Sequence, residues 1–523
     1  MLFLLIPTAI LLAAALIIFL ITRFRPNTGF CWLVGTVAAF AVWGWTIYLH
    51  WLPESSFSLN LFNTTLGFVL DKTSWISMLA SATLLLFAML TAPSRLHPDF
   101  STNTWDIILC AALTAIVASA TDGRWSIIFC WMLFDLTVIA PLLINPRGQG
   151  NSAPLNEMVI LQFGGTFLAS LGLAVSEAGI LLSTTAPASS LLFAACALRS
   201  GIFPLRIKKP EVNENVADEG IILKLTSLAV VFPLLARLNA AFVPDSIYQL
   251  LMLLAAASAF TCGLGALLSD SAFTKRQYMI LGIAGFAFVS ALRSQTTASI
   301  IWGAVILMAG GALLLYKNRS RLLDIVYLLL FLLSSGLPYA PAAGSWQGIV
   351  LQPPAFADFF LLAAYACIVI GLLEPLRSPS AHSPEPNDRW VSTVYPAGFI
   401  VPLISLGTAA YFGWNFLENL TVFWGIIPLY VIILLILTRN VWLRWTPQLP
   451  EKLVLPLELI KRIWQALIWL LSFRWLEIIV EALTFSLSLL IQFISDVFEG
   501  QGGILWKFLF LTVLLVLVIG RGI

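Results

Sequence analysis

Three charged side chains stand deep inside apolar segments of this sequence: Asp135, Arg199 and Lys224. The stretch FCWMLFDLTVIAPLLI, residues 129–144, carries the carboxylate of Asp135 as its one formal charge. A charge in the middle of a membrane is costly, so such residues usually pair with an opposite charge and mark a path for ions or protons. We therefore expect the Asp135 carboxylate to lie within ion-pairing reach of Arg199 or Lys224.

The two basic residues differ in what they can do inside a membrane. A lysine can lose its proton there, because burial favours the neutral form of an ammonium group. An arginine keeps its charge in proteins. One hypothesis is that the three residues form half of a proton or sodium path, with Arg199 as a fixed charge and Lys224 as the titrating group. The alternative is a neutralised remnant whose charges only hold three helices in register.

The segments that carry these residues have the composition of membrane-spanning helices. Of the 523 residues, 60% are hydrophobic and 10% are charged, whereas a soluble domain contains roughly a quarter charged residues. Apolar runs long enough to cross a ~30 Å hydrocarbon core recur from end to end. We predict an all-α polytopic membrane protein with about sixteen transmembrane helices, at 2–21, 30–51, 74–92, 104–120, 125–144, 156–176, 188–212, 216–237, 247–268, 275–292, 296–316, 322–342, 356–375, 396–414, 421–438 and 503–520. Pro204 and Pro338 are candidate helix breaks within these spans.

The lysines and arginines predict how the spans are oriented. Twenty of the 28 fall in the loops after odd-numbered spans or in the long segment before the last span, and five fall on the opposite side. Basic loops normally face the cytoplasm. We expect a multi-pass protein of the inner (plasma) membrane with cytoplasmic basic loops and both termini outside.

Other chemistry finds little support in the residues. The six cysteines stand singly in apolar segments, and the three histidines lie at a helix end or in loops, so we expect no metal site. No catalytic or nucleotide-binding motif such as HExxH, GxSxG or a P-loop occurs. We expect no catalytic centre, no cofactor and no nucleic-acid partner for this chain.

The segment 451–500 combines an apolar composition with one narrow polar face. Its C-terminal part places polar side chains at intervals of three or four residues: Glu477, Glu481, Thr484, Ser488, Gln492, Ser495 and Glu499. That periodicity predicts an amphipathic helix, and such a helix prefers to lie along the membrane surface or along other helices. The stripe changes phase near Ser472. The alternative interpretation is one further spanning helix followed by a short interfacial one.

Several motifs recur in the order and spacing of one known family. That family carries Trp-Glu and a Pro/Tyr-Leu-Leu-Ile tail in its fifth helix and Gly-Lys-Ser-Ala-x-x-Pro-Leu in its seventh. This sequence has Phe134, Asp135, Pro141, Leu142, Leu143 and Ile144, and then Leu198, Arg199, Ser200, Gly201, Pro204 and Leu205. Lys224 and Arg237 fall on a histidine and a closing arginine of helix eight. Before and within the later helices, the matching residues are Asp270, Lys275, Arg276, Gly310, Gly336, Leu337, Pro338, Gly344 and Trp346.

In these residues the chain resembles the antiporter-like membrane subunits of respiratory complex I, of Mrp-type cation/proton antiporters and of membrane-bound hydrogenases. Three family positions depart from the pattern. Arg199 replaces a lysine, Trp302 replaces another, and the lysine expected near Gln347 is missing. The family's Gly-Pro-Thr-Pro-Val-Ser turn has become NVADEG at 215–220.

The resemblance implies an inverted-repeat core with a long lateral helix before the last span. The implied parts are an N-terminal segment 1–103, a core 104–342 with repeats at about 104–240 and 247–375, C-terminal helices 343–450, the lateral helix 451–500 and a final span 501–523. It also implies proton or sodium translocation coupled to redox chemistry on other membrane subunits, which would hold the redox cofactors. A subunit that has lost pumping and serves as a membrane scaffold is the first alternative, and an unrelated secondary transporter is the second.

Overall fold

The computed structural model describes most of the chain, and its secondary structure is almost entirely helical. The described residues are 2–24, 30–61, 64–95, 103–144, 153–175, 186–205, 214–269, 271–316, 321–350, 356–374, 389–413, 425–437 and 451–473. The chain forms two compact units, residues 1–464 and 465–523. All elements considered below belong to the first unit, except the last residues of helix α20.

The first eight α-helices coincide with the first eight predicted spans, apart from an early end in α7. Their bounds are α1 Leu2–Phe24, α2 Phe30–Tyr48, α3 Lys72–Arg95, α4 Asn103–Ser119, α5 Arg124–Ile144, α6 Ala153–Val175, α7 Ala186–Ser200 and α8 Glu214–Arg237. Helices suit these sequences because an apolar segment in lipid must satisfy its backbone hydrogen bonds internally. The span expected at 188–212 ends at Ser200 as a helix, for reasons given below.

The next group of helices contains two interruptions, one after Met308 and one after Ser334; the second precedes Pro338, which was named above as a candidate helix break. The bounds are α9 Asp245–Leu268, α10 Ala272–Leu292, α11 Thr296–Met308, α12 Gly310–Leu314, α13 Arg321–Ser334, the 3-10 helix η3 Ala343–Trp346, α14 Gln347–Val350 and α15 Phe356–Leu373. The span expected at 296–316 is thus two helices, and the span expected at 322–342 ends as a helix at Ser334.

The C-terminal helices are described only in part. They are α16 Arg389–Thr408, a π-helical turn η5 Ala409–Gly413, α18 Ile426–Leu437 and α20 Glu451–Leu471. A turn with Phe473 at φ 51° follows α20, close to the position where the polar stripe changes phase. The rest of the predicted lateral helix and the predicted span 503–520 lie outside the described residues.

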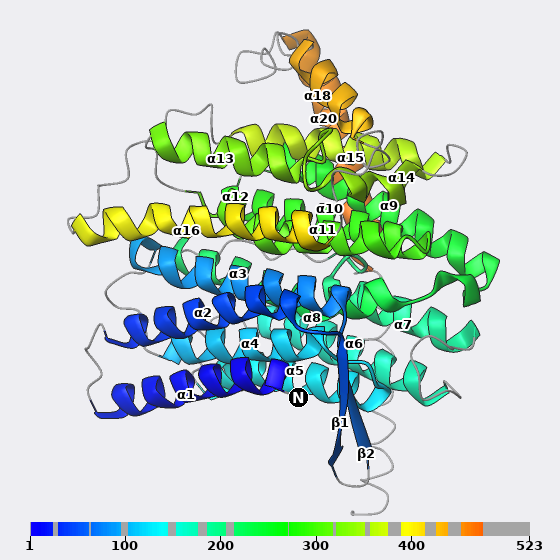
Figure 1. Cartoon of the computed structure of the whole chain (residues 1–523). Helices are drawn as coiled ribbons and strands as arrows, with labels where there is room; N and C mark the ends of the chain where they lie inside the picture. Colours follow the sequence, from blue (N-terminus) through cyan, green and yellow to red (C-terminus); the bar gives the residue numbers. More distant parts are fainter. Residues whose placement is uncertain are drawn as a thin grey trace, which may run out of the picture. The chain divides into compact units, whose positions relative to one another are not determined.

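A β-hairpin interrupts the helical order between α2 and α3, and the predicted spans did not include it. Strands β1 Ser55–Leu61 and β2 Thr64–Leu70 pair antiparallel, and Figure 1 shows the hairpin extending away from the helices. One face of β2 is anchored, because Leu66, Phe68 and Leu70 are buried and Phe68 forms a bridge with Thr121 after α4.

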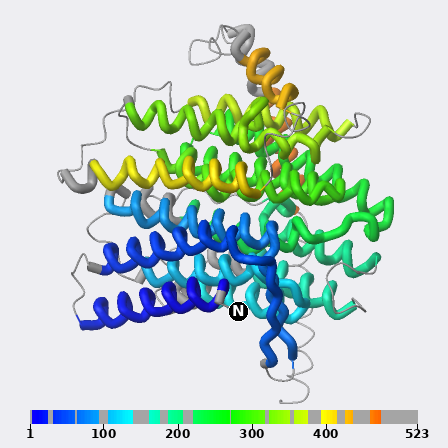
Figure 2. The backbone as a smooth tube through the Cα atoms, in the orientation of Figure 1, coloured from blue at the N-terminus to red at the C-terminus, as the bar shows by residue number. Residues whose placement is uncertain are grey.

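Within the first unit, the helices lie side by side around α3 (Figures 1 and 2). Helix α3 packs against α2, α4, α8, α11 and α16, and 94% of its most apolar window is buried. Helix α6 packs along α7, and α9 packs along both α10 and α15. The first eight helices contact the later ones where α8 packs against α10 and α11 and where α3 packs against α11 and α16.

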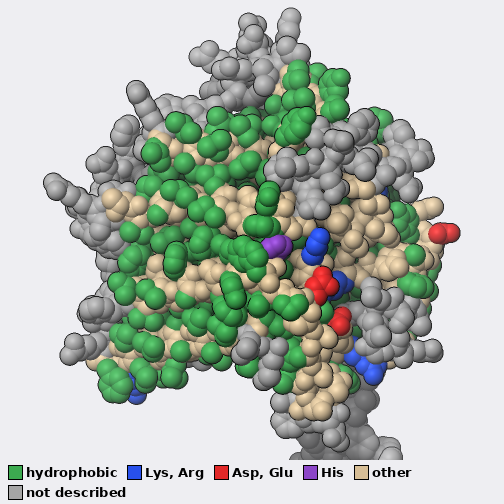
Figure 3. Space-filling model, in the orientation of Figure 1, with side chains coloured by type: hydrophobic (Ala, Val, Ile, Leu, Met, Phe, Trp, Pro, Cys, Tyr) green, Lys and Arg blue, Asp and Glu red, His purple; other side chains and the backbone are tan. Residues whose placement is uncertain are grey.

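The outer faces of the helices are apolar. Leu16, Phe19, Val37 and Phe40 on α1 and α2 are each more than half exposed. Figure 3 shows hydrophobic side chains covering the lengths of the helices on this face, while most of the visible charged side chains gather toward the right of the view. Seven of the described helices are long and apolar enough to cross a membrane, and five shorter ones are also apolar. The prediction of an all-α polytopic membrane protein is confirmed, whereas the count of sixteen spans stays a prediction.

Candidate functional site

The Asp135 carboxylate and the Arg199 guanidinium form an ion pair between α5 and α7. Arg199 Nη2 donates to Asp135 Oδ1 at 2.6 Å, and Nη1 donates to Oδ2 at 3.2 Å. Both side chains are 0% exposed. The pairing expected from the sequence is therefore present, with Arg199 as the partner. A bidentate pair of this kind is stronger and more directional than a single contact.

Groups from α5 and α6 complete the surroundings of the pair. The Thr166 hydroxyl donates to Asp135 Oδ2 at 2.6 Å, and it lies 2.6 Å from Arg199 Nη1. The backbone oxygens of Gln162 and Trp131 each accept from the guanidinium at 3.4 Å. The guanidinium carbon also lies 4.6 Å from the centroid of the Trp131 ring, within cation–π distance. Desolvation of the charges is thus offset by several partners on three helices.

Small residues on α6 allow α7 to come close enough for these contacts. A Cβ atom built at Gly165 would lie 2.9 Å from Arg199 Cβ, and one at Gly172 would lie 3.2 Å from the Ala188 oxygen. Gly165 and Gly172 stand seven residues apart, on the same side of α6. Small residues at such spacing let membrane helices approach backbone to backbone. The sequence of α6 thereby sets the position of Arg199.

Helix α7 ends at Ser200, one residue after Arg199 and before the uncharged residues GIFPL. The Gly201 N–H donates to the Leu198 oxygen and the Ile202 N–H donates to the Ala197 oxygen, both at 3.1 Å, with Gly201 at φ +74°. This is a Schellman motif, and its left-handed position is one that glycine adopts without steric cost. Pro204 follows in the turn. The helix therefore ends at the glycine, and the proline prevents it from restarting.

Lys224 lies beside this break but is not part of the ion pair. Its Nζ atom is 3.9 Å from the position that a Cβ atom of Gly201 would occupy. The C-terminal end of a helix carries a partial negative charge, which favours a cation there. The Ser258 hydroxyl of α9 also donates to the Ile202 oxygen in the turn. Among the described residues, Lys224 forms no ion pair with Asp135 or another carboxylate.

The second interruption, after α13, is surrounded by aromatic side chains. Gly336 adopts φ +75° and precedes Pro338, the other candidate helix break. The Trp302 indole donates to the Ser345 oxygen at 3.1 Å, and its ring lies 5.9 Å from that of Trp346. No described lysine, arginine or acidic residue lines the apolar cavity of about 30 Å³ at this place.

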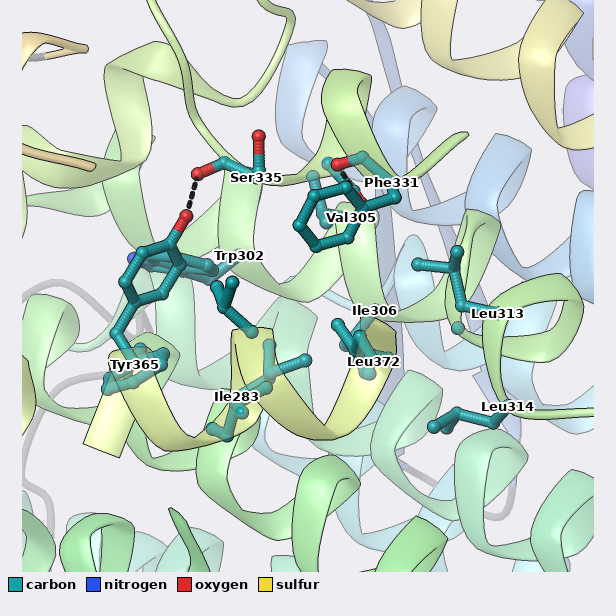
Figure 4. A pocket seen from close by; sticks show the side chains of 15 residues that line it. Ile283, Trp302, Val305, Ile306, Leu313, Leu314, Phe331, Ser335, Tyr365 and Leu372 are labelled. Atoms are coloured by element: carbon teal, nitrogen blue, oxygen red, sulfur yellow. Dashed lines mark hydrogen bonds between the residues drawn. The ribbon is translucent and has the colours of Figure 1, made fainter. Parts of the chain in front are cut away.

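Figure 4 shows this cavity, with Trp302 and Tyr365 on one side and Phe331 and Leu313 on the other. The Tyr365 hydroxyl donates to the Ser335 oxygen at 2.6 Å. In the family that the sequence resembles, lysines occupy the position of Trp302 and a position near Gln347. At and near these positions, this chain has the neutral aromatic residues Trp302 and Trp346 instead.

Two further arginines, which we did not single out as pairing residues, form ion pairs between the ends of helices. Arg237 at the end of α8 pairs with Asp71 at 3.0 Å and donates to the Thr121 oxygen. Arg293 after α10 pairs with Asp358 at the start of α15, and the two side chains are 7% and 6% exposed. Their positions at helix ends indicate a structural role.

Gln162, Thr166 and Trp131 were missed by sequence reasoning. A signal for the first two was present, because Gln162, Thr166 and Ser170 are spaced by four residues in an otherwise apolar helix. This spacing puts their polar side chains on one face. No comparable signal singles out Trp131 among nineteen tryptophans.

Comparison with known proteins confirms the resemblance at the level of the fold. No protein-family model and no curated protein matches the sequence. Among solved structures, the chain is similar to a chain of the Mrp complex from Dietzia sp. DQ12-45-1b, with 14% identity and a TM-score of 0.64. That match covers 99% of this chain and 63% of the Mrp chain, so the chain spans less than two thirds of that relative's length.

Two other assemblies contain chains of similar fold. A chain of the membrane-bound sulfane sulfur reductase, an archaeal respiratory membrane complex, matches with 13% identity and a TM-score of 0.66 over 98% of this chain and 99% of its own. A chain of respiratory complex I from Thermus thermophilus with bound NADH matches with 16% identity and a TM-score of 0.58, over 82% of this chain and 99% of its own. At these identities the likeness concerns the fold.

Proposed function

We propose that the chain is an antiporter-like membrane subunit of a multi-subunit assembly of the Mrp or complex I kind. Its fold supports this, because it is similar to chains of the Mrp complex, of the sulfane sulfur reductase and of respiratory complex I. Other membrane subunits and the lipid bilayer are its partners. The redox cofactors of such an assembly reside on partner subunits, and the chain resides in the plasma membrane with its basic loops in the cytoplasm and both termini outside.

We further propose that the chain contributes to proton or sodium translocation through its first half. The observation that carries this is the buried Asp135–Arg199 pair one residue before the end of α7, with the Lys224 ammonium beside that end. Arg199 supplies a charge that does not titrate. Lys224 can exchange a proton, and the field of the neighbouring pair biases that exchange.

The test is translocation by the purified assembly in liposomes, followed with a pH-sensitive dye inside the vesicles. Lys224→Met keeps the volume of the side chain and removes its charge, so we expect the initial rate of pH change to fall at least tenfold. Lys275→Met is the matched control, because Lys275 pairs with the half-exposed Glu374. An unchanged rate in Lys224→Met would contradict a translocation role.

The second candidate function is a membrane scaffold without pumping. The cluster of Trp302, Trp346 and Tyr365 favours it, because neutral aromatic residues stand where the resembled family has a lysine. A scaffold predicts that Lys224→Met and the wild type give identical ion fluxes, while loss of the chain disassembles the complex on a native gel. The same liposome measurement therefore separates the two functions.

A further inference from the structure

The side chain of Gln162 lies between the ion pair and helix α8. It stands on α6, is 6% exposed, and donates through Nε2 to the Ser227 hydroxyl of α8 at 3.1 Å. Its own backbone oxygen accepts from Arg199 Nη1 at 3.4 Å. One residue thus contacts Arg199 on one side and α8 on the other.

Two polar atoms at this place have no hydrogen-bond partner among the described residues: Gln162 Oε1 and Arg199 Nε. Both residues are more than nine-tenths buried, at 6% and 4% exposure. One atom is an acceptor and the other is a donor. If the oxygen and nitrogen of the Gln162 amide are exchanged, Oε1 bonds to the Ser227 hydroxyl, which can donate or accept, and Nε2 is then the amide atom without a partner.

One water molecule bound between these two atoms would satisfy both: its oxygen would accept from the Arg199 Nε–H, and one of its hydrogens would be donated to Gln162 Oε1. Leaving a buried polar atom unpaired costs roughly 1–3 kcal/mol, and buried waters typically bond to such atoms. The two unpaired atoms belong to residues already in contact, so one small polar ligand suits them.

The other end of the amide bonds to Ser227 of α8, the helix that carries Lys224. Ser227 follows Lys224 by three residues on α8, and residues at that spacing lie on the same face of a helix. The polar groups therefore form a series from the Asp135 carboxylate through Arg199, Gln162 and Ser227 to the face that carries Lys224. Helices α5, α7, α6 and α8 each contribute to the series.

We propose that Gln162 and Arg199 Nε bind one buried water molecule, and that the Gln162 amide with this water connects the Asp135–Arg199 pair to Lys224. Gln162 is then a positioning residue: it holds the water and fixes the distance between the fixed charge and the titrating group. The connecting role rests on the proposed translocation function, whereas the water site does not.

The water site is tested by cryo-electron microscopy of the intact assembly at a resolution that shows ordered water. We expect density within hydrogen-bond distance of both Arg199 Nε and the Gln162 amide. Gln162→Met has nearly the same shape without polar atoms, and we expect the density to be lost while the ion pair stays in place. A wild-type map without this density, or density unchanged in Gln162→Met, would overturn the site.

The connecting role is tested by the liposome rates of three variants. Gln162→Met and Ser227→Ala should lower the rate to the level of Lys224→Met. Thr226→Val is the matched control, because Thr226 is similarly buried and, among the residues that the structure describes, its hydroxyl bonds only to the Ile222 oxygen of its own helix.

The measured rates distinguish failure of the connecting role from failure of the translocation function. If Lys224→Met lowers the rate and Gln162→Met equals the wild type, the connecting role of the amide is wrong. If Lys224→Met itself has no effect, the translocation function fails, and the density at Gln162 still decides the water site. Native-gel migration of each variant verifies assembly.

Discussion

The Asp135–Arg199 pair should show a large energetic coupling that is absent from an exposed pair of the same chain. Asp135→Leu leaves the guanidinium without its two carboxylate bonds at 2.6 and 3.2 Å, in a site where both side chains are 0% exposed. Hydrogen bonds to charged groups are worth about 1.5–3 kcal/mol each. Two such bonds agree with the about 3–5 kcal/mol lost when one partner of a buried pair is removed. We expect this loss for Asp135→Leu and for Arg199→Met.

The double variant should recover most of that loss, because no unpaired charge remains in the site. Replacing both members of a buried ion pair with apolar residues of similar volume is often neutral or stabilising. The coupling free energy is the sum of the two single losses minus the loss of the double variant, so it is expected to be about 6–10 kcal/mol when the double variant is nearly neutral, well above the ~0.6 kcal/mol average of hydrogen bonds between membrane helices. Unfolding in mixed detergent micelles, monitored by tryptophan fluorescence, measures the free energy of unfolding of each variant.

An exposed pair provides the control cycle. Glu374 is 51% exposed in its pair with Lys275, so the coupling there should not exceed about 1 kcal/mol. If the Asp135–Arg199 coupling is equally small, or if the double variant loses as much as the two single variants together, the pair does not hold α5 and α7 together electrostatically. The physical basis of the candidate site would then be wrong.

Two further substitutions test how the helices position the charges. Gly165→Val places methyl groups against Arg199 Cβ and should lower the free energy of unfolding by about 1–3 kcal/mol. Gly44→Val is the control and should change it little, because nothing lies within 4 Å of the Cβ position of Gly44. Equal effects of the two variants would contradict close packing of α6 on α7. Arg293→Met should cost about 3–5 kcal/mol in the same unfolding measurement, because it removes the cation that pairs with the buried Asp358 carboxylate; a loss below 1 kcal/mol would contradict a structural role for this pair.

The positions of most helices follow from hydrophobicity, but the places where helices end do not. The five uncharged residues GIFPL follow Ser200 before the basic stretch RIKK at 206–209, so a span read from hydropathy continues past Ser200, and the predicted span ended at 212. The helix stops earlier because Gly201 takes a left-handed conformation and Pro204 lacks a backbone N–H. Pro233 lies inside α8 without ending it. A proline alone therefore does not predict a break; a glycine shortly before it is the better signal.

The β-hairpin was missed although its sequence carries a local signal. Phe57, Leu59 and Leu61 alternate with polar residues, a period of two that favours a strand. A search for spans of about twenty apolar residues overlooks so short a segment.

The candidate site, in contrast, was predicted from the sequence in part. The sequence predicted that Asp135 pairs with a basic residue, because an isolated charge in a membrane needs an opposite charge nearby. Whether Arg199 or Lys224 is that partner depends on helix packing, which no single-sequence pattern specifies.

Both broken helices face the same physical problem, and neutral donors take part at each: after α7, the Ser258 hydroxyl bonds to the Ile202 oxygen. A helix that ends inside a membrane leaves carbonyl oxygens without intrahelical donors, and lipid supplies none. After α13, neutral donors bond to two backbone oxygens of the interrupted segment: the Tyr365 hydroxyl to that of Ser335, and the Trp302 indole to that of Ser345 in η3. Neutral groups are therefore sufficient to support a break in this protein. A charged group such as Lys224 beside the end of α7 is more expensive than a neutral donor, so structural support alone does not account for it. This difference between the two halves is the physical reason to look for ion movement in the first half and not in the second.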